Sequence, residues 1–203
     1  MFPTVPVNVF LGCRQTDKSE KDAMFPHFSL CCAVAFVVLV QLHSEARGLR
    51  HYDHSTHVLD IGHEWLPLLH IERGVDTILA LLPSLVCLLL YRRRYGQRFI
   101  DDVVTMYVCR ALVSLGTILP SCANESPPSL HFGAGLVTGR HDKWWSGHMS
   151  LAHLVARHAQ LSPSSFCAFL TCTALCLLLP RMHYTADVVL GILGAELIFC
   201  RAY

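Results

Sequence analysis

The sequence predicts an all-α membrane protein, a bundle of six transmembrane helices. Apolar residues make up 53% of the 203 residues and charged residues only 15%, whereas soluble domains average roughly 25% charged residues. The mean hydropathy is positive. The apolar residues also gather in long runs with polar stretches between them, which is the pattern of successive membrane crossings. The net charge of +1 gives no indication of a nucleic-acid partner.

We expect a short polar cytosolic tail over 1–27 and a helical membrane domain over 28–203. The tail mixes acids and bases without a helical or strand period. The first apolar run, 28–42, reaches the length of a crossing, about 20 residues, when Phe25 is included. A signal peptide is the alternative, because basic residues precede the run, but no Ala-x-Ala cleavage site follows it. We therefore interpret the run as a membrane anchor.

Five further segments complete the predicted bundle, and they cover 75–91, 100–122, 148–160, 161–179 and 184–200. Pro83 is expected to kink the first of these. Segment 148–160 is the least apolar, since histidine and arginine interrupt it, and it needs shelter from its neighbours. The basic cluster 92–98 places one side of the bundle in the cytosol. His148 and Asp187 then lie at the same lumenal or exoplasmic membrane face.

Two motifs carry the chemistry. His183 and Asp187 are four residues apart, so on a helix they share one face, where the carboxylate can orient the imidazole. Ser146-Gly147-His148 opens another helix at the same predicted depth. An imidazole oriented by an acid is the minimal device for activating a nucleophile. The pair of motifs is much more specific than either one alone.

These residues suit displacement at phosphorus. His183 would attack a phosphate ester and form a phosphohistidine, with Asp187 orienting its ring. His148 would act as general acid and then as general base, since histidine titrates near pH 6.5. Charge on the phosphoryl oxygens needs cations or N–H donors, for which Arg110, Arg140, Lys143, Arg181 and the backbone near Gly147 are the candidates. A histidine nucleophile requires no Lewis acid, so we expect no metal and no cofactor.

The two motifs resemble those of the sphingomyelin synthase family, within the lipid phosphatase and phosphotransferase superfamily. Asp142 to His148 is similar to the third family motif, and His183 to Val188 is similar to the fourth. Thr105 to Arg110 resembles the second motif, and Asp60 to Pro67 resembles the first, both more loosely. The resemblance covers about residues 55–200.

The resemblance implies an integral membrane enzyme of the Golgi, other endomembranes or the plasma membrane. It would move a phospho-head-group of choline, ethanolamine or inositol type from a glycerophospholipid to ceramide and release diacylglycerol. Its catalytic residues would be His148, His183 and Asp187. Substrate-binding residues would be Arg110, Arg140, Asp142, Lys143, Ser146, Gly147, Arg181 and Tyr184. Oligomerisation is compatible with this expectation.

Two departures from the superfamily patterns bear on the reaction. Arg140-His141-Asp142 stands where the family has Cys-Gly-Asp, which leaves the head group open. The chain has no Lys-x6-Arg-Pro phosphatase motif, and Leu177 occupies the position where phosphatases carry an arginine. Both absences favour a transferase. The alternatives are a lipid phosphatase or phospholipase C-like hydrolase, and a non-catalytic membrane protein that binds ceramide.

Overall fold

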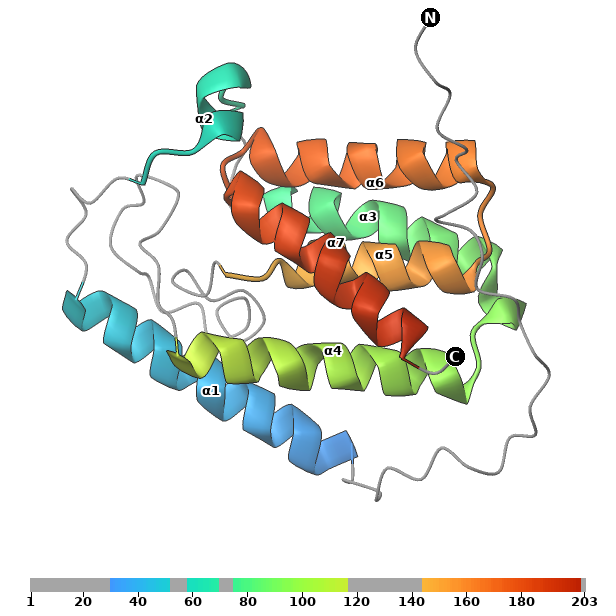
Figure 1. Cartoon of the computed structure of the whole chain (residues 1–203), viewed down its shortest axis with the longest axis horizontal. Helices are drawn as coiled ribbons and strands as arrows, with labels where there is room; N and C mark the ends of the chain where they lie inside the picture. The colour runs from blue at the N-terminus through green and yellow to red at the C-terminus, as the bar shows by residue number, and fades with distance from the viewer. Residues whose placement is uncertain (1–29, 52–57, 70–74, 117–143, 202–203) are drawn as a thin grey trace, which may run out of the picture.

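A computed structural model of the chain describes residues 30–51, 58–69, 75–116 and 144–201. The tail predicted over 1–27 lies outside these ranges. Most of the described residues are helical (Figure 1). The α-helices are α1 (Leu30–His51), α2 (Ile61–Trp65), α3 (Val75–Leu90), α4 (Gln97–Gly116), α5 (Gly147–His158), α6 (Pro163–Leu178) and α7 (Thr185–Cys200). A 3₁₀ turn, η2 (Arg92–Arg94), joins α3 to α4.

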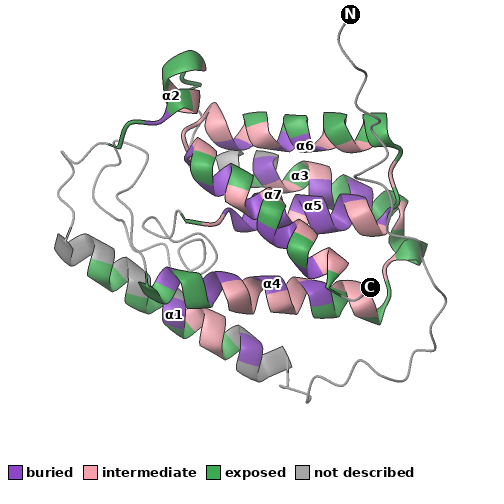
Figure 2. Ribbon diagram, in the orientation of Figure 1, coloured by how far each residue is buried: buried purple, intermediate pink, exposed green. Residues whose placement is uncertain are grey.

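Helix α5 is the centre of the fold. It packs against α3, α4, α6 and α7, while α1 lies along α4 at the edge of the molecule (Figure 1). Nearly the whole of α5 is buried (Figure 2). Small residues of this helix, Ala152 and Ala156, and Ala159 at its C-cap have no exposed surface. Because these residues are small, neighbouring helices can approach α5 closely.

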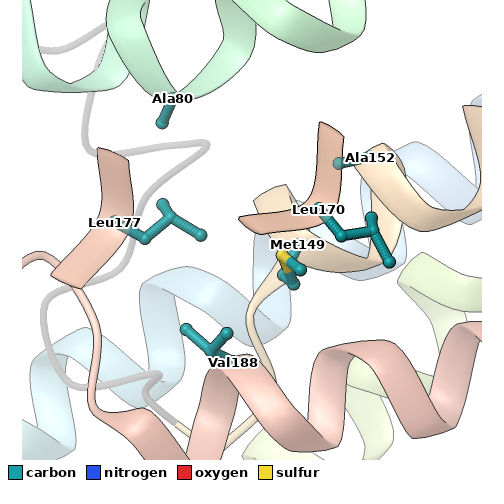
Figure 3. Packing of buried hydrophobic residues seen from close by; sticks show 6 residues of the cluster. All are labelled: Ala80, Met149, Ala152, Leu170, Leu177 and Val188. Carbon is teal, nitrogen blue, oxygen red and sulfur yellow. The ribbon is translucent and has the colours of Figure 1, made fainter. Parts of the chain in front are cut away.

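One apolar cluster joins α5 to three of its neighbours. Met149 and Ala152 of α5 meet Leu170 and Leu177 of α6, with Ala80 of α3 and Val188 of α7 completing the cluster (Figure 3). Burial of a leucine or methionine side chain stabilises a fold by about 1.5–3 kcal/mol. The cluster therefore fixes the start of α5 against α7, where the functional motifs lie.

Capping residues decide where the helices begin. Ser146 caps α5 by accepting a hydrogen bond from the backbone N–H of Met149 at 3.2 Å. Ser162 caps α6 in the same way, and Pro163 occupies the first helical position, which suits its fixed φ. Tyr184 precedes α7 and supplies no side-chain capping bond. These ends make α6 and α7 shorter than the apolar runs that contain them.

The predicted six-helix transmembrane bundle is wrong, although a helix occurs in each of the six predicted segments. None of the described helices combines the length and the apolar composition that a membrane crossing requires. Helices α3, α6 and α7 have 16 residues each. Such a helix is about 24 Å long, against a hydrocarbon core of about 30 Å. The longer helices fail for another reason, because α1 is polar after Leu42 and α4 carries Arg98, Asp101, Asp102 and Arg110.

The predicted multi-pass placement in the Golgi, other endomembranes or the plasma membrane depended on those crossings and is wrong with them. The same holds for the orientation that placed the site on a lumenal or exoplasmic face. The apolar runs that suggested crossings include capping and turn residues such as Ser162 and Tyr184. The mean hydropathy of such a run gives no sign that a helix begins or ends within it.

Candidate active site

The first turns of α5 and α7 meet inside the bundle. The backbone N–H of Ser146 donates to the carbonyl oxygen of Asp187 at 3.0 Å. The Ser150 hydroxyl donates to the Gly191 carbonyl at 2.9 Å. A Cβ atom at Gly191 would lie 2.9 Å from the Ser146 carbonyl oxygen, so glycine is what permits this approach. The contact brings the two sequence motifs to one place.

His183 and Asp187 form the expected pair. His183 lies in the turn before α7 and Asp187 in its first turn. Nδ1 of His183 lies 2.5 Å from Oδ2 of Asp187, and both side chains are buried. A carboxylate can only accept this hydrogen bond, so the Nδ1 proton is donated to it. The proton of the neutral His183 ring is therefore on Nδ1, and Nε2 is the nitrogen that can react.

His148 lies against this pair. It occupies the first turn of α5 and is 9% exposed. Its ring meets the His183 ring edge to face, with centroids 5.7 Å apart and planes inclined at 68°. The structure thus brings together the three residues predicted to be catalytic, and we call His148, His183 and Asp187 the His-His-Asp site.

Arg110 reaches this region from α4. Its side chain is buried, and its Nε donates to the Trp145 carbonyl oxygen at 2.9 Å. A Cβ atom on Gly147 would lie only 3.4 Å from that Nε, so the guanidinium group lies directly against the start of α5. A buried cation therefore lies beside a helix N-terminus, and both favour negative charge.

The other predicted substrate-binding residues differ in what they contact. Ser146 caps α5, and Tyr184 is buried with its ring 5.6 Å from that of His63. Arg181 has a left-handed backbone, with φ of 56°, and its Nη2 donates to the His63 carbonyl oxygen at 2.6 Å. Arg181 thus binds the backbone of α2. Arg140, Asp142 and Lys143 lie outside the described residues.

Asp60 and His63 belong to the surroundings of the site and were not predicted as site residues. Asp60 accepts hydrogen bonds from the backbone N–H of Thr185 at 2.7 Å and from its hydroxyl at 2.8 Å. His63 Nε2 donates to the His183 carbonyl oxygen at 2.9 Å. The loose resemblance of Asp60 to Pro67 to a family motif marked this segment without indicating these contacts.

The hydrogen bonds to Asp60 determine its charge. Burial raises the pKa of its carboxyl, but the hydrogen bonds from Thr185 and from the His63 backbone outweigh burial and lower the pKa below its ordinary value. Asp60 is therefore an anion at neutral pH. It faces the positive end of α7, where an anion is favoured.

Two further histidine–carboxylate pairs on α5 were also missed. His153 Nε2 donates to Glu196 at 2.7 Å, and Arg157 donates to the other oxygen of Glu196 at 2.9 Å. His158 Nε2 donates to buried Asp102 at 2.9 Å. Neither pair has the four-residue spacing that pointed to His183 and Asp187. Their partners come from other helices, so no local pattern could reveal them.

Over the described ranges, no three His, Cys, Asp or Glu side chains gather closely enough to hold a metal ion. Comparison with known proteins gave no match to a protein family, to a curated protein or to a solved structure. The chemistry assigned to the His-His-Asp site therefore rests on the geometry and the residues of this chain.

Proposed function

We propose that this chain is a phosphotransferase that works through a phosphohistidine on His183. One observation carries the proposal. A histidine whose Nδ1 is bonded to a buried carboxylate lies edge to face with a second histidine. The first ring has the orientation of a nucleophile and the second is placed to move a proton.

In the first step, Nε2 of His183 attacks the phosphorus atom of a phosphodiester. An N–P bond forms and the bond from phosphorus to the leaving alkoxide oxygen breaks. His148 gives its proton to that oxygen, so an alcohol departs. Asp187 stabilises the positive charge that develops on the His183 ring.

In the second step, His148 takes the proton of an acceptor hydroxyl. The acceptor oxygen attacks phosphorus, the N–P bond breaks, and His183 returns to its starting state. The same imidazole serves as acid and then as base, as the two half-reactions require.

Arg110 and the start of α5 supply the electrostatic contribution. Negative charge grows on the phosphoryl oxygens during each transfer. The Arg110 guanidinium group lies against Gly147, one residue before His148. Helix N-termini and guanidinium groups are both suited to phosphate oxygens. We therefore assign Arg110 and the backbone at Gly147 to phosphoryl binding.

For the substrates, we propose a glycerophospholipid as donor and ceramide as acceptor, with diacylglycerol as the released alcohol. The support is the resemblance of 142–148 and 183–188 to sphingomyelin synthase motifs and the missing phosphatase signature. A phosphodiester carries one negative charge, so it requires fewer fixed cations than a phosphomonoester.

The test combines purified protein, labelled ceramide and mixed micelles of choline, ethanolamine and inositol phospholipids. We expect a labelled phosphosphingolipid and, after a rapid quench, an acid-labile phospho-head-group on His183. Release of diacylglycerol without transfer to ceramide would assign water as the acceptor instead. Ceramide binding without any product, equal in wild type and in His183→Gln, would exclude catalysis.

A further inference from the structure

Helix α7 begins just after His183 and carries Asp187, but its own capping residue does not cap its N-terminus. Tyr184 at the capping position makes no side-chain hydrogen bond to the first turn. The cap comes from Asp60, which lies 125 residues away in the chain. Asp60 Oδ2 accepts the Thr185 N–H at 2.7 Å, and Oδ1 accepts the Thr185 hydroxyl at 2.8 Å.

The same carboxylate caps α2. Oδ1 of Asp60 also accepts the backbone N–H of His63 at 3.1 Å. The Gly62 N–H donates to the Thr185 hydroxyl oxygen at 3.1 Å, and a Cβ at Gly62 would collide with that oxygen. The two helix starts are thus joined through a single carboxylate and a single hydroxyl.

The segment around His183 makes further contacts with α2 and its cap. Its carbonyl oxygen accepts from His63 Nε2, and two residues later the Thr185 N–H donates to Asp60. The Arg181 guanidinium group holds the His63 carbonyl from the other side. The backbone at residue 183 is therefore held from before and after by α2, which we call the α2 clasp (residues 60–65).

We propose that Asp60 is a positioning residue for the nucleophile: through Thr185 and the α2 clasp it fixes where the His183 ring stands relative to His148. This inference rests on the proposed function, because it assigns Asp60 a part in presenting that nucleophile. Transfer reactions need the reacting atoms held in a near-attack geometry, and a displacement of about 1 Å can cost about 100-fold in rate. Asp60 itself need not touch the substrate.

Thr185 provides a matched pair of variants. Thr185→Ser keeps the hydroxyl that bonds Asp60 and Gly62, whereas Thr185→Val removes it at nearly constant volume. We expect Thr185→Val and Asp60→Asn to slow phosphohistidine formation by about 10- to 100-fold, with KM for the donor unchanged. Thr185→Ser should stay within about twofold of wild type. Glu64→Gln, which removes an exposed charge from the same short helix, is the control for charge alone.

A second measurement needs no substrate. Hydrogen exchange at the Thr185 and Val188 amides should become faster in Thr185→Val and Asp60→Asn but not in Thr185→Ser. If both variants form phosphohistidine at the wild-type rate, Asp60 is not a positioning residue and the proposed function stands. If wild type forms no phosphohistidine, the proposed function fails. If amide exchange is also unchanged in Thr185→Val and Asp60→Asn, the α2 clasp is overturned as well. Should Asp60→Asn fail to fold, the two Thr185 variants decide the matter.

Discussion

The imidazole rings of His148 and His183 lie edge to face with their centroids 5.7 Å apart, although they come from the starts of two different helices. One ring is oriented by Asp187, and the other begins the central helix of the fold. A phosphate ester bound against both rings would meet a nucleophile and a proton donor at once. The division of labour between the two histidines can therefore be tested.

His148→Gln should slow transfer from a phospholipid by about 10²–10⁴-fold, because the poor alkoxide leaving group then departs without a proton. The loss should shrink to a few-fold with a p-nitrophenyl phosphodiester, whose leaving group needs none. His183→Gln should abolish transfer from both substrates. The measurement is the single-turnover rate with each donor. An equal loss for both donors in His148→Gln would contradict the role of His148 as an acid.

A comparison of Asp187→Asn with Asp102→Asn should separate an effect on the catalytic rate from an effect on stability. Each aspartate is buried and accepts a hydrogen bond from a histidine, but only Asp187 belongs to the His-His-Asp site. We expect Asp187→Asn to lower the chemical rate by about 10²–10⁴-fold, as loss of an orienting carboxylate does.

Asp102→Asn should instead lower the stability by about 1–3 kcal/mol, because His158 loses a charged partner inside the protein. Its single-turnover rate at low temperature should stay near that of wild type. Chemical denaturation and rapid-quench rates on the same samples provide the comparison. A large rate loss in Asp102→Asn would show that the two pairs are not distinct in function.

Gly194→Ala should destabilise the packing of α7 on the segment before α5. A Cβ at this position would overlap the Trp145 indole ring, whose Nε1 donates to the Ser150 hydroxyl at 2.5 Å. Overpacking of this kind costs about 1–3 kcal/mol. Gly96→Ala is the matched control, because the added Cβ meets no described atom within 4 Å. Equal melting temperatures for the two variants would contradict the close contact at Gly194.

The bond between α5 and α7 through Glu196 predicts a dependence of stability on pH. The hydrogen bond from His153 is the main cause that lowers the pKa of Glu196 below its ordinary value of 4.5, with Arg157 adding to it against burial. The stabilisation is therefore complete above about pH 5.5 and is lost as the pH falls through the lowered pKa. Glu196→Gln should thus lower Tm at pH 7, and lower it by less near pH 3.

Asp101→Asn serves as the control for that experiment, since this exposed carboxylate bonds only one described side chain, Gln97. We expect its Tm to match wild type at both pH values. A Tm difference for Glu196→Gln that does not shrink on acidification would show that the charge on Glu196 is not what joins the helices.

Local patterns were sufficient for most of the helices, though not for α2 or for the part of α1 after residue 42, and for one side-chain pair. The apolar runs 75–91, 161–179 and 184–200 each contain a helix, and Ser162 with Pro163 marks a helix start. His183 and Asp187 were predicted to meet because a spacing of four would place them on one helical face. They do meet, although His183 lies in the turn before α7 and only Asp187 is in the helix. Such interactions depend on backbone geometry within a single turn.

The apolar runs led to a wrong prediction of what surrounds those helices, namely lipid. The sequence does not distinguish an apolar residue that packs against another helix from one that faces lipid. Leu177 is fully buried in the cluster with Met149 and Val188. Other large apolar side chains, such as Leu90 and Leu197, are exposed. Composition alone could not assign these roles, and the predicted membrane crossings followed from it.

The sequence by itself determined where most of the helices form and that His183 would be paired with Asp187, because both depend on residues a few positions apart in the chain. The tertiary structure alone decided that His148 lies beside that pair, that Asp60 caps α7 and that Arg181 braces α2. These contacts join residues far apart in the chain, so they exist only once α5, α7 and α2 have packed together. Packing depends on the shapes of whole helix faces, which no short motif contains.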